Sequence, residues 1–167
     1  MGKRSNFARI EKDAYATPKE ALIPVLPYLH RDVLYYEPCC GEGKLVKHLM
    51  NEGFGFWGYS DDELDARYTD YDIPPWPKTQ FITNPPWSRE LLHPIIENLS
   101  RQAGTWLLFD ADWMHTRQAS ELIKRCAIIV SVGRVKWIVN SKTTGKDNCC
   151  WYFFAPNYFE GPHFYGR

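Results

Sequence analysis

Residues 33–45 read Val-Leu-Tyr-Tyr-Glu-Pro-Cys-Cys-Gly-Glu-Gly-Lys-Leu, an apolar run that passes into a proline and a turn with two glycines. The run at Val33–Tyr36 has the pattern of a buried strand, and apolar residues then recur at helical spacing over 45–50. Gly41 and Gly43 let a ligand approach the backbone, and the start of the helix presents free N–H groups. A strand, a glycine turn and a helix in this order predict an α/β fold with a ligand site at the turn.

The glycine spacing narrows the kind of ligand. The dinucleotide fingerprint has a third glycine, which this turn lacks. A phosphate-binding P-loop has Ser or Thr after its Gly-Lys pair, whereas Leu45 follows Lys44 here. The turn therefore favours neither a nicotinamide cofactor nor a nucleoside triphosphate.

A second motif lies downstream, where residues 81–87 read Phe-Ile-Thr-Asn-Pro-Pro-Trp. A strand cannot continue through the two prolines, because neither has a backbone N–H to donate, so the chain leaves the sheet in a stiff turn. The side-chain oxygen of Asn84 and the carbonyl of Pro85 are then fixed acceptors beside the flat indole of Trp87. An amino group on a planar ring could donate to both oxygens and stack on the indole.

The two motifs together, Glu-Pro-x-x-Gly-x-Gly at 37–43 and Asn-Pro-Pro-Trp at 84–87, each follow a strand. Their combination resembles the S-adenosylmethionine-dependent DNA adenine-N6 methyltransferases of the small phage type, over residues 14–155. The resemblance implies S-adenosyl-L-methionine as cofactor and methyl transfer to the exocyclic N6 amine of adenine in DNA. It implies a catalytic loop formed by Asn84, Pro85, Pro86 and Trp87.

Cofactor contacts implied by the resemblance come from several loops. Tyr15-x-Thr17-Pro18 would lie against the methionine end of the cofactor, although Thr17 with Glu20 can also be read as the capping box of a helix. Glu37 would reach the amino group of the cofactor through its loop. The full predicted set is Tyr15, Thr17, Pro18, Glu37, Pro38, Cys39, Gly41, Gly43, Asp61, Asp70, Asp72 and Asn84.

The acids of that set follow two expected strands. A strand at 54–59 ends in Ser-Asp-Asp, and Asp61 is placed to accept the ribose hydroxyls of an adenosine, although a simple turn explains the same residues. Residues 66–72 are expected to form a short third strand, after which either Asp70 or Asp72 would accept the adenine amino group.

The rest of the chain completes the predicted sheet. Strands are expected at 80–83, 105–109, 127–132 and 149–155, and helices at 90–99 and 117–125. The segment from Gly133 to the last strand resembles the closing hairpin of the small phage-type enzymes. The predicted fold is α/β, Rossmann-like, with a mostly parallel seven-stranded sheet, one antiparallel strand and helices on both faces.

Residues near the end of the fifth strand and in the hairpin are candidates for substrate contact. His115 could act as a base, but a structural or solvated histidine is the favoured interpretation. The predicted substrate-binding residues are Trp87, Trp113, Arg134 and Lys136.

Composition limits the partners. The 167 residues fit one methyltransferase domain over 1–167, with residues 1–13 as a flexible basic arm or a frayed terminus. Lys and Arg number 20, equal to Asp and Glu, so net charge gives little support to nucleic-acid binding, although DNA is the favoured partner. Because no separate target-recognition domain fits, target choice would be loose or supplied by a partner chain.

The five cysteines are Cys39, Cys40, Cys126, Cys149 and Cys150. Buried free thiols are favoured over a zinc site built from the two adjacent pairs, so no metal is predicted. The sequence has no apolar run of membrane-spanning length and no secretory signal at its start, which favours the cytoplasm of a bacterium or of a phage-infected cell.

Two other functions stay open. The same loop chemistry suits methylation of an RNA adenine or of a protein glutamine. A module that binds a cofactor or nucleic acid without turnover is the alternative from outside enzymes. All methyltransferase readings require Asn84 to lie close to the turn at Gly41 and Gly43.

Overall fold

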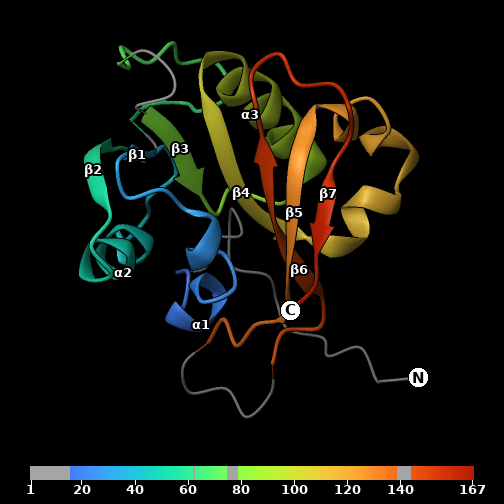
Figure 1. The fold of residues 1–167 in the computed structure, drawn as a ribbon, viewed down its shortest axis with the longest axis horizontal. Helices are drawn as coiled ribbons and strands as arrows, with labels where there is room; N and C mark the ends of the chain where they lie inside the picture. Colours follow the sequence, from blue (N-terminus) through green and yellow to red (C-terminus); the bar gives the residue numbers. More distant parts are fainter. Residues whose placement is uncertain (1–15, 62, 75–78, 139–143) are drawn as a thin grey trace.

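The computed structural model describes residues 16–61, 63–74, 79–138 and 144–167. Seven strands form one sheet in the order β2-β1-β3-β4-β6-β5-β7 (Figure 1). Only β6 runs antiparallel to its neighbours β4 and β5, and all other adjacent pairs are parallel. The predicted sheet, mostly parallel with one antiparallel strand, is confirmed. The strands are β1 (Leu34–Glu37), β2 (Gly55–Tyr59), β3 (Thr79–Thr83), β4 (Gly104–Asp110), β5 (Cys126–Arg134), β6 (Asn148–Phe154) and β7 (His163–Tyr165).

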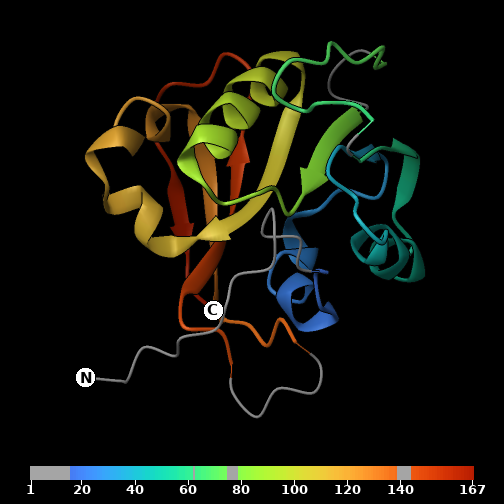
Figure 2. The ribbon, with the colours of Figure 1, turned by 180° about the vertical axis from the view of Figure 1, so that it is seen from behind.

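Helices cover both faces of the sheet, as predicted. The long helix α3 lies across one face (Figure 2), and the short α1 and α2 pack on the other. Their bounds are α1 (Lys19–Leu22), α2 (Lys44–Asn51) and α3 (Arg89–Gln102), and single turns of 3-10 helix occur at η2 (Leu26–Tyr28), η3 (Ala111–His115), η4 (Arg117–Ala119) and η5 (Ile123–Arg125). None of the helices within the described ranges is both long and apolar enough to cross a bilayer.

Alternation along the strands divides the core into two layers. Consecutive residues point to opposite faces of a sheet, so neighbours in sequence enter different clusters. Tyr36 and Phe109 belong to the cluster under α3, whereas Tyr35 and Leu108 belong to the cluster under α1 and α2. In β6, Trp151 reaches across to α1, where its indole N–H donates to the carbonyl of Ala21 at 2.8 Å.

The expected third strand at 66–72 is wrong. The segment folds as turns, and the seventh strand of the sheet is β7, from the aromatic tail. The cause is local: the Asp65 carboxylate accepts from the backbone N–H of Arg67 at 3.0 Å, and the Asp65 carbonyl accepts from the N–H of Thr69 at 2.9 Å. Such bonds compete with strand pairing. As a result, β2 stands at the edge of the sheet.

Two further differences concern helices. The helix expected at 117–125 is replaced by the short turns η4 and η5, and residues 120–122 between them form a turn. Ala119 at the end of η4 and Leu122 just before η5 are buried. The capping box at Thr17 does not form, because the Glu20 carboxylate instead accepts from the backbone N–H of Lys136 at 2.7 Å.

Candidate active site

A cavity of about 780 Å³ opens at the carboxyl ends of β1, β2 and β3. In the parallel register Tyr36 lies opposite Phe81, so the turn after Glu37 and the loop of Asn84 leave the sheet side by side. Open α/β sheets bind their ligands at this edge. The wall comprises Ala16, Thr17, Glu37, Pro38, Cys39, Cys40, Gly41, Glu42, Lys44, Leu45, Asp61, Leu64, Asp65, Ala66, Arg67, Asn84, Pro86, Leu91 and Ile95.

The turn after β1 has the backbone that its glycines predict. Gly41 and Gly43 have φ of 47° and 69°, a left-handed region that is strained for other residues. A Cβ at either position would meet open space, so backbone conformation rather than crowding selects glycine. The Cys40 N–H donates to the Ser60 carbonyl and the Ser60 N–H to the Glu37 carbonyl, both at 2.9 Å. These bonds join the first two loops of the cavity into one surface.

The charged groups of the wall leave an acidic balance. Lys44 pairs with Glu42 at 3.1 Å, and Arg67 pairs with Asp65 at 2.7 Å. Among the wall residues, Glu37 and Asp61 have no basic counterpart on the wall. A cavity of this composition favours a ligand that carries positive charge.

Glu37 is the most unusual of these acids. The residue is 2% exposed, and its Oε2 has no hydrogen-bond partner in the part of the chain that the structure describes. Burial raises the pKa of the carboxyl well above its ordinary value, and the Asp61 charge adds to this rise. Hydrogen bonds from the Val46 amide and the Thr83 hydroxyl lower the pKa of Glu37, but each by less than burial raises it. A buried, unpartnered carboxyl at the cavity edge is suited to a cationic ligand group.

The raised pKa of Glu37 predicts that the folded protein becomes less stable as pH rises. Because the folded state holds this proton more tightly than the unfolded state, the stabilisation is present in acid and is lost as pH rises from the unfolded pKa towards the folded one. Each unit of difference is about 1.4 kcal/mol. Urea midpoints of the ligand-free protein should therefore fall more between pH 5 and pH 8 for the wild type than for Glu37→Gln. Parallel pH profiles for the two proteins would contradict the prediction.

The Asn84 loop is fixed by the indole of Trp87. Its Nε1–H donates to the Asn84 Oδ1 and to the Leu108 carbonyl, both at 3.1 Å. The indole also packs edge-to-face on Trp137, with ring centres 5.6 Å apart. Trp87 therefore ties the loop to β4 and orients the Asn84 amide. The aromatic ring does not line the cavity, where Pro86 forms the wall instead.

The structure brings most of the predicted cofactor residues to the cavity, but not all of them. Thr17, which is 4% exposed, lies on the wall together with Glu37, Pro38, Cys39, Gly41, Asp61 and Asn84. Pro18, Gly43 and the buried Pro85 adjoin wall residues without lining the cavity themselves. The predicted Tyr15 and the basic arm at 1–13 lie outside the described residues.

Asp70 and Asp72 do not line the cavity. Asp70 is exposed and pairs with Arg101 near the end of α3 at 2.7 Å. The expectation that either acid meets a cofactor depended on a third strand that would have carried them to the carboxyl edge. Without that strand, the cavity wall uses the turn at 64–67, which the sequence patterns did not single out.

The predicted substrate residues are also dispersed. Trp113 is 3% exposed and lies in the core, where its indole donates to His93 Nε2 at 2.9 Å. Its surroundings contradict the expected place in a target pocket, because Phe109 and Tyr152 pack against its ring. Arg134 is exposed at the C-terminal end of β5, and Lys136 follows the strand and is half-buried. Neither residue lines the cavity.

The cysteines are free. Burial raises the pKa of Cys39 to about 12 and of Cys40 to about 11, so both thiols beside the cavity are neutral near pH 7. No cluster of metal-ligating side chains occurs within residues 16–61, 63–74, 79–138 and 144–167.

Comparison with known proteins shows a shared fold. No family model matches the chain, and no curated protein matches its sequence. Among solved structures, a proposed RNA methyltransferase from Pyrococcus horikoshii is similar at a TM-score of 0.54 and 12% identity, with 92% of this chain and 93% of that chain covered. The EcoKI M protein of a type I restriction enzyme gives a TM-score of 0.52 and 12% identity, covering 92% of this chain and 49% of that one.

A dimethyladenosine transferase from Plasmodium falciparum gives a TM-score of 0.50 and 14% identity, with 86% of this chain covered. The chain spans only 63% of the length of that transferase and about half that of the EcoKI M protein. The fold is that of the methyltransferases, and these levels of identity establish the fold alone.

Proposed function

We propose that the protein transfers a methyl group from S-adenosyl-L-methionine to the exocyclic N6 amine of adenine in nucleic acid, with DNA as the favoured substrate. One observation carries the proposal: the turn at Glu37–Gly41 and the Asn84 loop line one cavity. Both motifs of the small phage-type adenine methyltransferases therefore act on the same space.

The charges of the cavity suit the cofactor. S-adenosyl-L-methionine carries a sulfonium and an ammonium, which suit an acidic wall and the unpartnered Glu37 Oε2. The open space over Gly41 leaves the backbone accessible. Glu37, Gly41, Asp61 and Thr17 would hold the cofactor, which when bound supplies the electrophilic methyl group.

The Asn84 loop would activate the acceptor. The exocyclic amine of adenine is a poor nucleophile, because its lone pair is delocalised into the ring. The Asn84 Oδ1 and the Pro85 carbonyl would accept its two N–H groups and favour a pyramidal nitrogen. The Trp87 indole holds the Asn84 amide in a fixed orientation, so part of the geometry exists before the base arrives. Transfer would then be direct, without a covalent link to the protein: the N–CH3 bond would form as the S–CH3 bond breaks, S-adenosylhomocysteine would leave, and the nitrogen would lose one proton to water.

Access to the base limits the substrate. An adenine stacked in a duplex cannot enter such a cavity, so it must be flipped out or already single-stranded. Arg134 and Lys136 in the β5–β6 hairpin would contact the phosphates, and Trp87 would act on the base through the Asn84 amide that it orients. Because net charge is zero, we infer that a partner chain contributes to target choice.

RNA adenine is the second candidate. The protein from Plasmodium falciparum is described as a dimethyladenosine transferase, and the protein from Pyrococcus horikoshii as a proposed RNA methyltransferase. The EcoKI M protein belongs instead to a restriction enzyme. The neighbours thus include both kinds of system, and the choice of DNA rests on the phage-type resemblance of the motifs.

Labelled-methyl transfer distinguishes the candidates. The protein is incubated with methyl-labelled S-adenosylmethionine and, separately, with adenine-containing DNA, RNA and a protein pool. We expect label in DNA, recovered as N6-methyladenine. Label only in RNA or protein would replace the proposed substrate, and cofactor binding without any transfer would favour the non-catalytic module.

Asp61→Ala is expected to weaken binding of S-adenosylmethionine about tenfold, or about 1.4 kcal/mol. Asp61 lies on the wall after β2, where a carboxylate can accept ribose hydroxyls. Calorimetry with the cofactor measures the change. Glu121→Ala, which removes an exposed pair with Lys124 outside the cavity, serves as the control. Equal affinities of Asp61→Ala and wild type would remove Asp61 from the cofactor site.

A further inference from the structure

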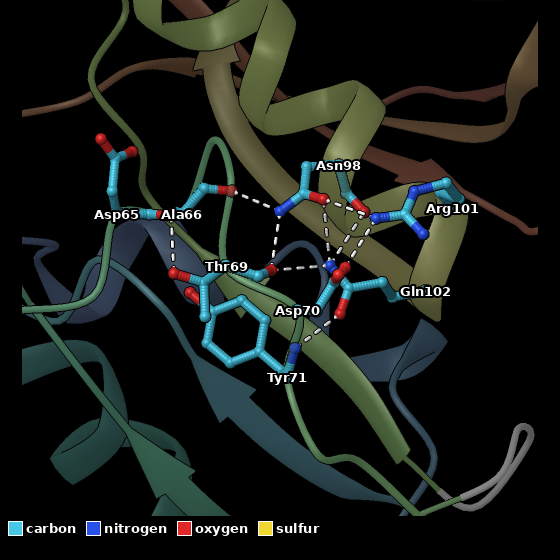
Figure 3. Close-up of polar contacts among 8 residues, drawn as sticks. All are labelled: Asp65, Ala66, Thr69, Asp70, Tyr71, Asn98, Arg101 and Gln102. Carbon is cyan, nitrogen blue, oxygen red and sulfur yellow. Dashed lines mark hydrogen bonds and ion pairs between the residues drawn. The ribbon is translucent and has the colours of Figure 1, made fainter.

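A stripe of polar side chains on α3 holds the segment that replaced the expected third strand (Figure 3). The Asn98 Nδ2 donates to the carbonyl of Ala66 at 3.0 Å and to that of Thr69 at 2.9 Å. One turn further along α3, the Gln102 Nε2 donates to the same Thr69 carbonyl at 3.0 Å, and its Oε1 accepts from the Tyr71 N–H at 2.8 Å. Two amide side chains thus make four hydrogen bonds to three backbone groups of 66–71, the carbonyls of Ala66 and Thr69 and the N–H of Tyr71.

Outside these bonds, the segment contacts the fold mainly through apolar packing, with the Tyr71 ring against Tyr36 and Phe81. Its backbone bonds are local, such as those from Tyr68 and Thr69 back to Asp65 and from Ile73 to Tyr71. No strand pairing involves residues 63–74. The remaining polar contact with α3 in this region is the exposed pair between Arg101 and Asp70, and exposed pairs contribute little. The amide side chains of α3 therefore hydrogen-bond the backbone of this segment, as neighbouring strands do for a strand in a sheet.

The same stripe of α3 also forms part of the cavity. Leu91 and Ile95 line the cavity, and Asn98 and Gln102 continue from them at helical spacing. Ala66 connects the segment held by α3 to the cavity. Its carbonyl accepts from Asn98, its side chain is 6% exposed, and it belongs to the cavity wall. The position of this wall is consequently set by α3.

We propose that Asn98 and Gln102 are positioning residues that hold the wall at 64–67 in the geometry that binds the cofactor. The proposal rests on the function proposed above, because it takes the cavity as the cofactor site. Asn98 is 8% exposed and satisfied on both sides, since its Oδ1 accepts from Arg101 at 3.0 Å and from Gln102 at 3.2 Å. A buried asparagine inside a helix is unfavourable unless such partners use it.

The test uses Asn98→Asp, which keeps the size of the side chain but removes both N–H donors. Arg101→Gln is the matched control, because it removes the exposed pair with Asp70 and the Arg101 donor to the Asn98 Oδ1, and leaves the bonds to the backbone of 66–71 in place. Hydrogen exchange of the ligand-free protein and calorimetry with S-adenosylhomocysteine and S-adenosylmethionine are measured for each variant.

In Asn98→Asp we expect faster exchange over 64–71, including the Tyr71 amide, with exchange in β1, β3 and β4 unchanged. Cofactor affinity should fall about tenfold, equal to about 1.4 kcal/mol. The KM for the cofactor should rise while kcat at saturating cofactor stays within about twofold of the wild type. A general loss of stability would not confine its effect to one segment and one constant.

Unchanged exchange over 64–71 or unchanged cofactor affinity in Asn98→Asp would overturn the proposal. A wild type that binds neither cofactor would instead refute the proposed function, so the two failures are distinguishable. If Asn98→Asp does not fold, Gln102→Met provides the test. This change removes the bonds to Thr69 and Tyr71 at a half-buried position, and the same two readouts decide.

Discussion

Asn84→Ala is expected to reduce kcat for methyl transfer by about a hundredfold to a thousandfold, while affinity for S-adenosylmethionine changes little. The substitution removes the oxygen that would accept a proton of the target amine, and groups that stabilise a transition state by hydrogen bonding contribute effects of this size. Asn84 is held by the Trp87 indole rather than by the core, so its loss should not unfold the protein. Single-turnover transfer with labelled cofactor measures the rate.

Asn84→Asp is the matched variant for this prediction. An aspartate keeps the acceptor oxygen, and the family resemblance allows either residue before the two prolines. We expect Asn84→Asp to retain more activity than Asn84→Ala, with calorimetry showing cofactor binding in both. Activity of Asn84→Ala close to that of the wild type would end the assignment of this loop as catalytic.

Trp87→Phe is expected to lower kcat about tenfold and to destabilise the protein by about 1–3 kcal/mol. Phenylalanine keeps an aromatic ring against Trp137 but has no N–H, so the Asn84 Oδ1 and the Leu108 carbonyl both lose their donor. The Asn84 amide can then rotate away from its productive orientation. The rate effect should therefore appear in kcat more than in the KM for the cofactor.

Trp106→Phe separates positioning from stability. Trp106 is 2% exposed in the core of β4 and does not line the cavity, so its change to phenylalanine should destabilise the fold and leave kcat unchanged. Urea unfolding and transfer assays on both variants make the comparison. If Trp87→Phe and Trp106→Phe show the same loss of stability and neither changes kcat, Trp87 has no role in orienting Asn84.

The ionisation of Glu37 in the acidic cavity affects every measurement of cofactor binding described above. Glu37 is buried, its pKa is raised, and its Oε2 lacks a partner within the described ranges. A cationic ligand would supply the missing partner and favour the charged carboxylate. Measurements of cofactor affinity should therefore be made at a fixed pH, because binding and the ionisation of Glu37 are linked.

The sequence by itself determined the fold class and the meeting of the two motifs. Glu37 and Asn84 each follow a short apolar strand and stand before residues that end it, and parallel strands bring their carboxyl ends to one edge. Local patterns of this kind depend on residues within a few positions of each other. Such signals predicted six of the seven strands and one side of the cavity, whereas the antiparallel strand was implied by the resemblance of the closing hairpin.

Only the tertiary structure decided how residues 64–71 and the tryptophans are used. Residues 66–72 do not pair as a strand, because hydrogen bonds to Asp65 form a turn there instead. The Asn98 side chain donates to the carbonyl of Ala66, 32 positions away in the chain. Trp87 bonds to Leu108 across 21 positions, whereas Trp113 is buried by Phe109 and Tyr152. No local periodicity encodes these contacts, because each arises where segments distant in sequence pack together. These long-range contacts set the position of the cavity wall at 64–67 and the orientation of the Asn84 amide.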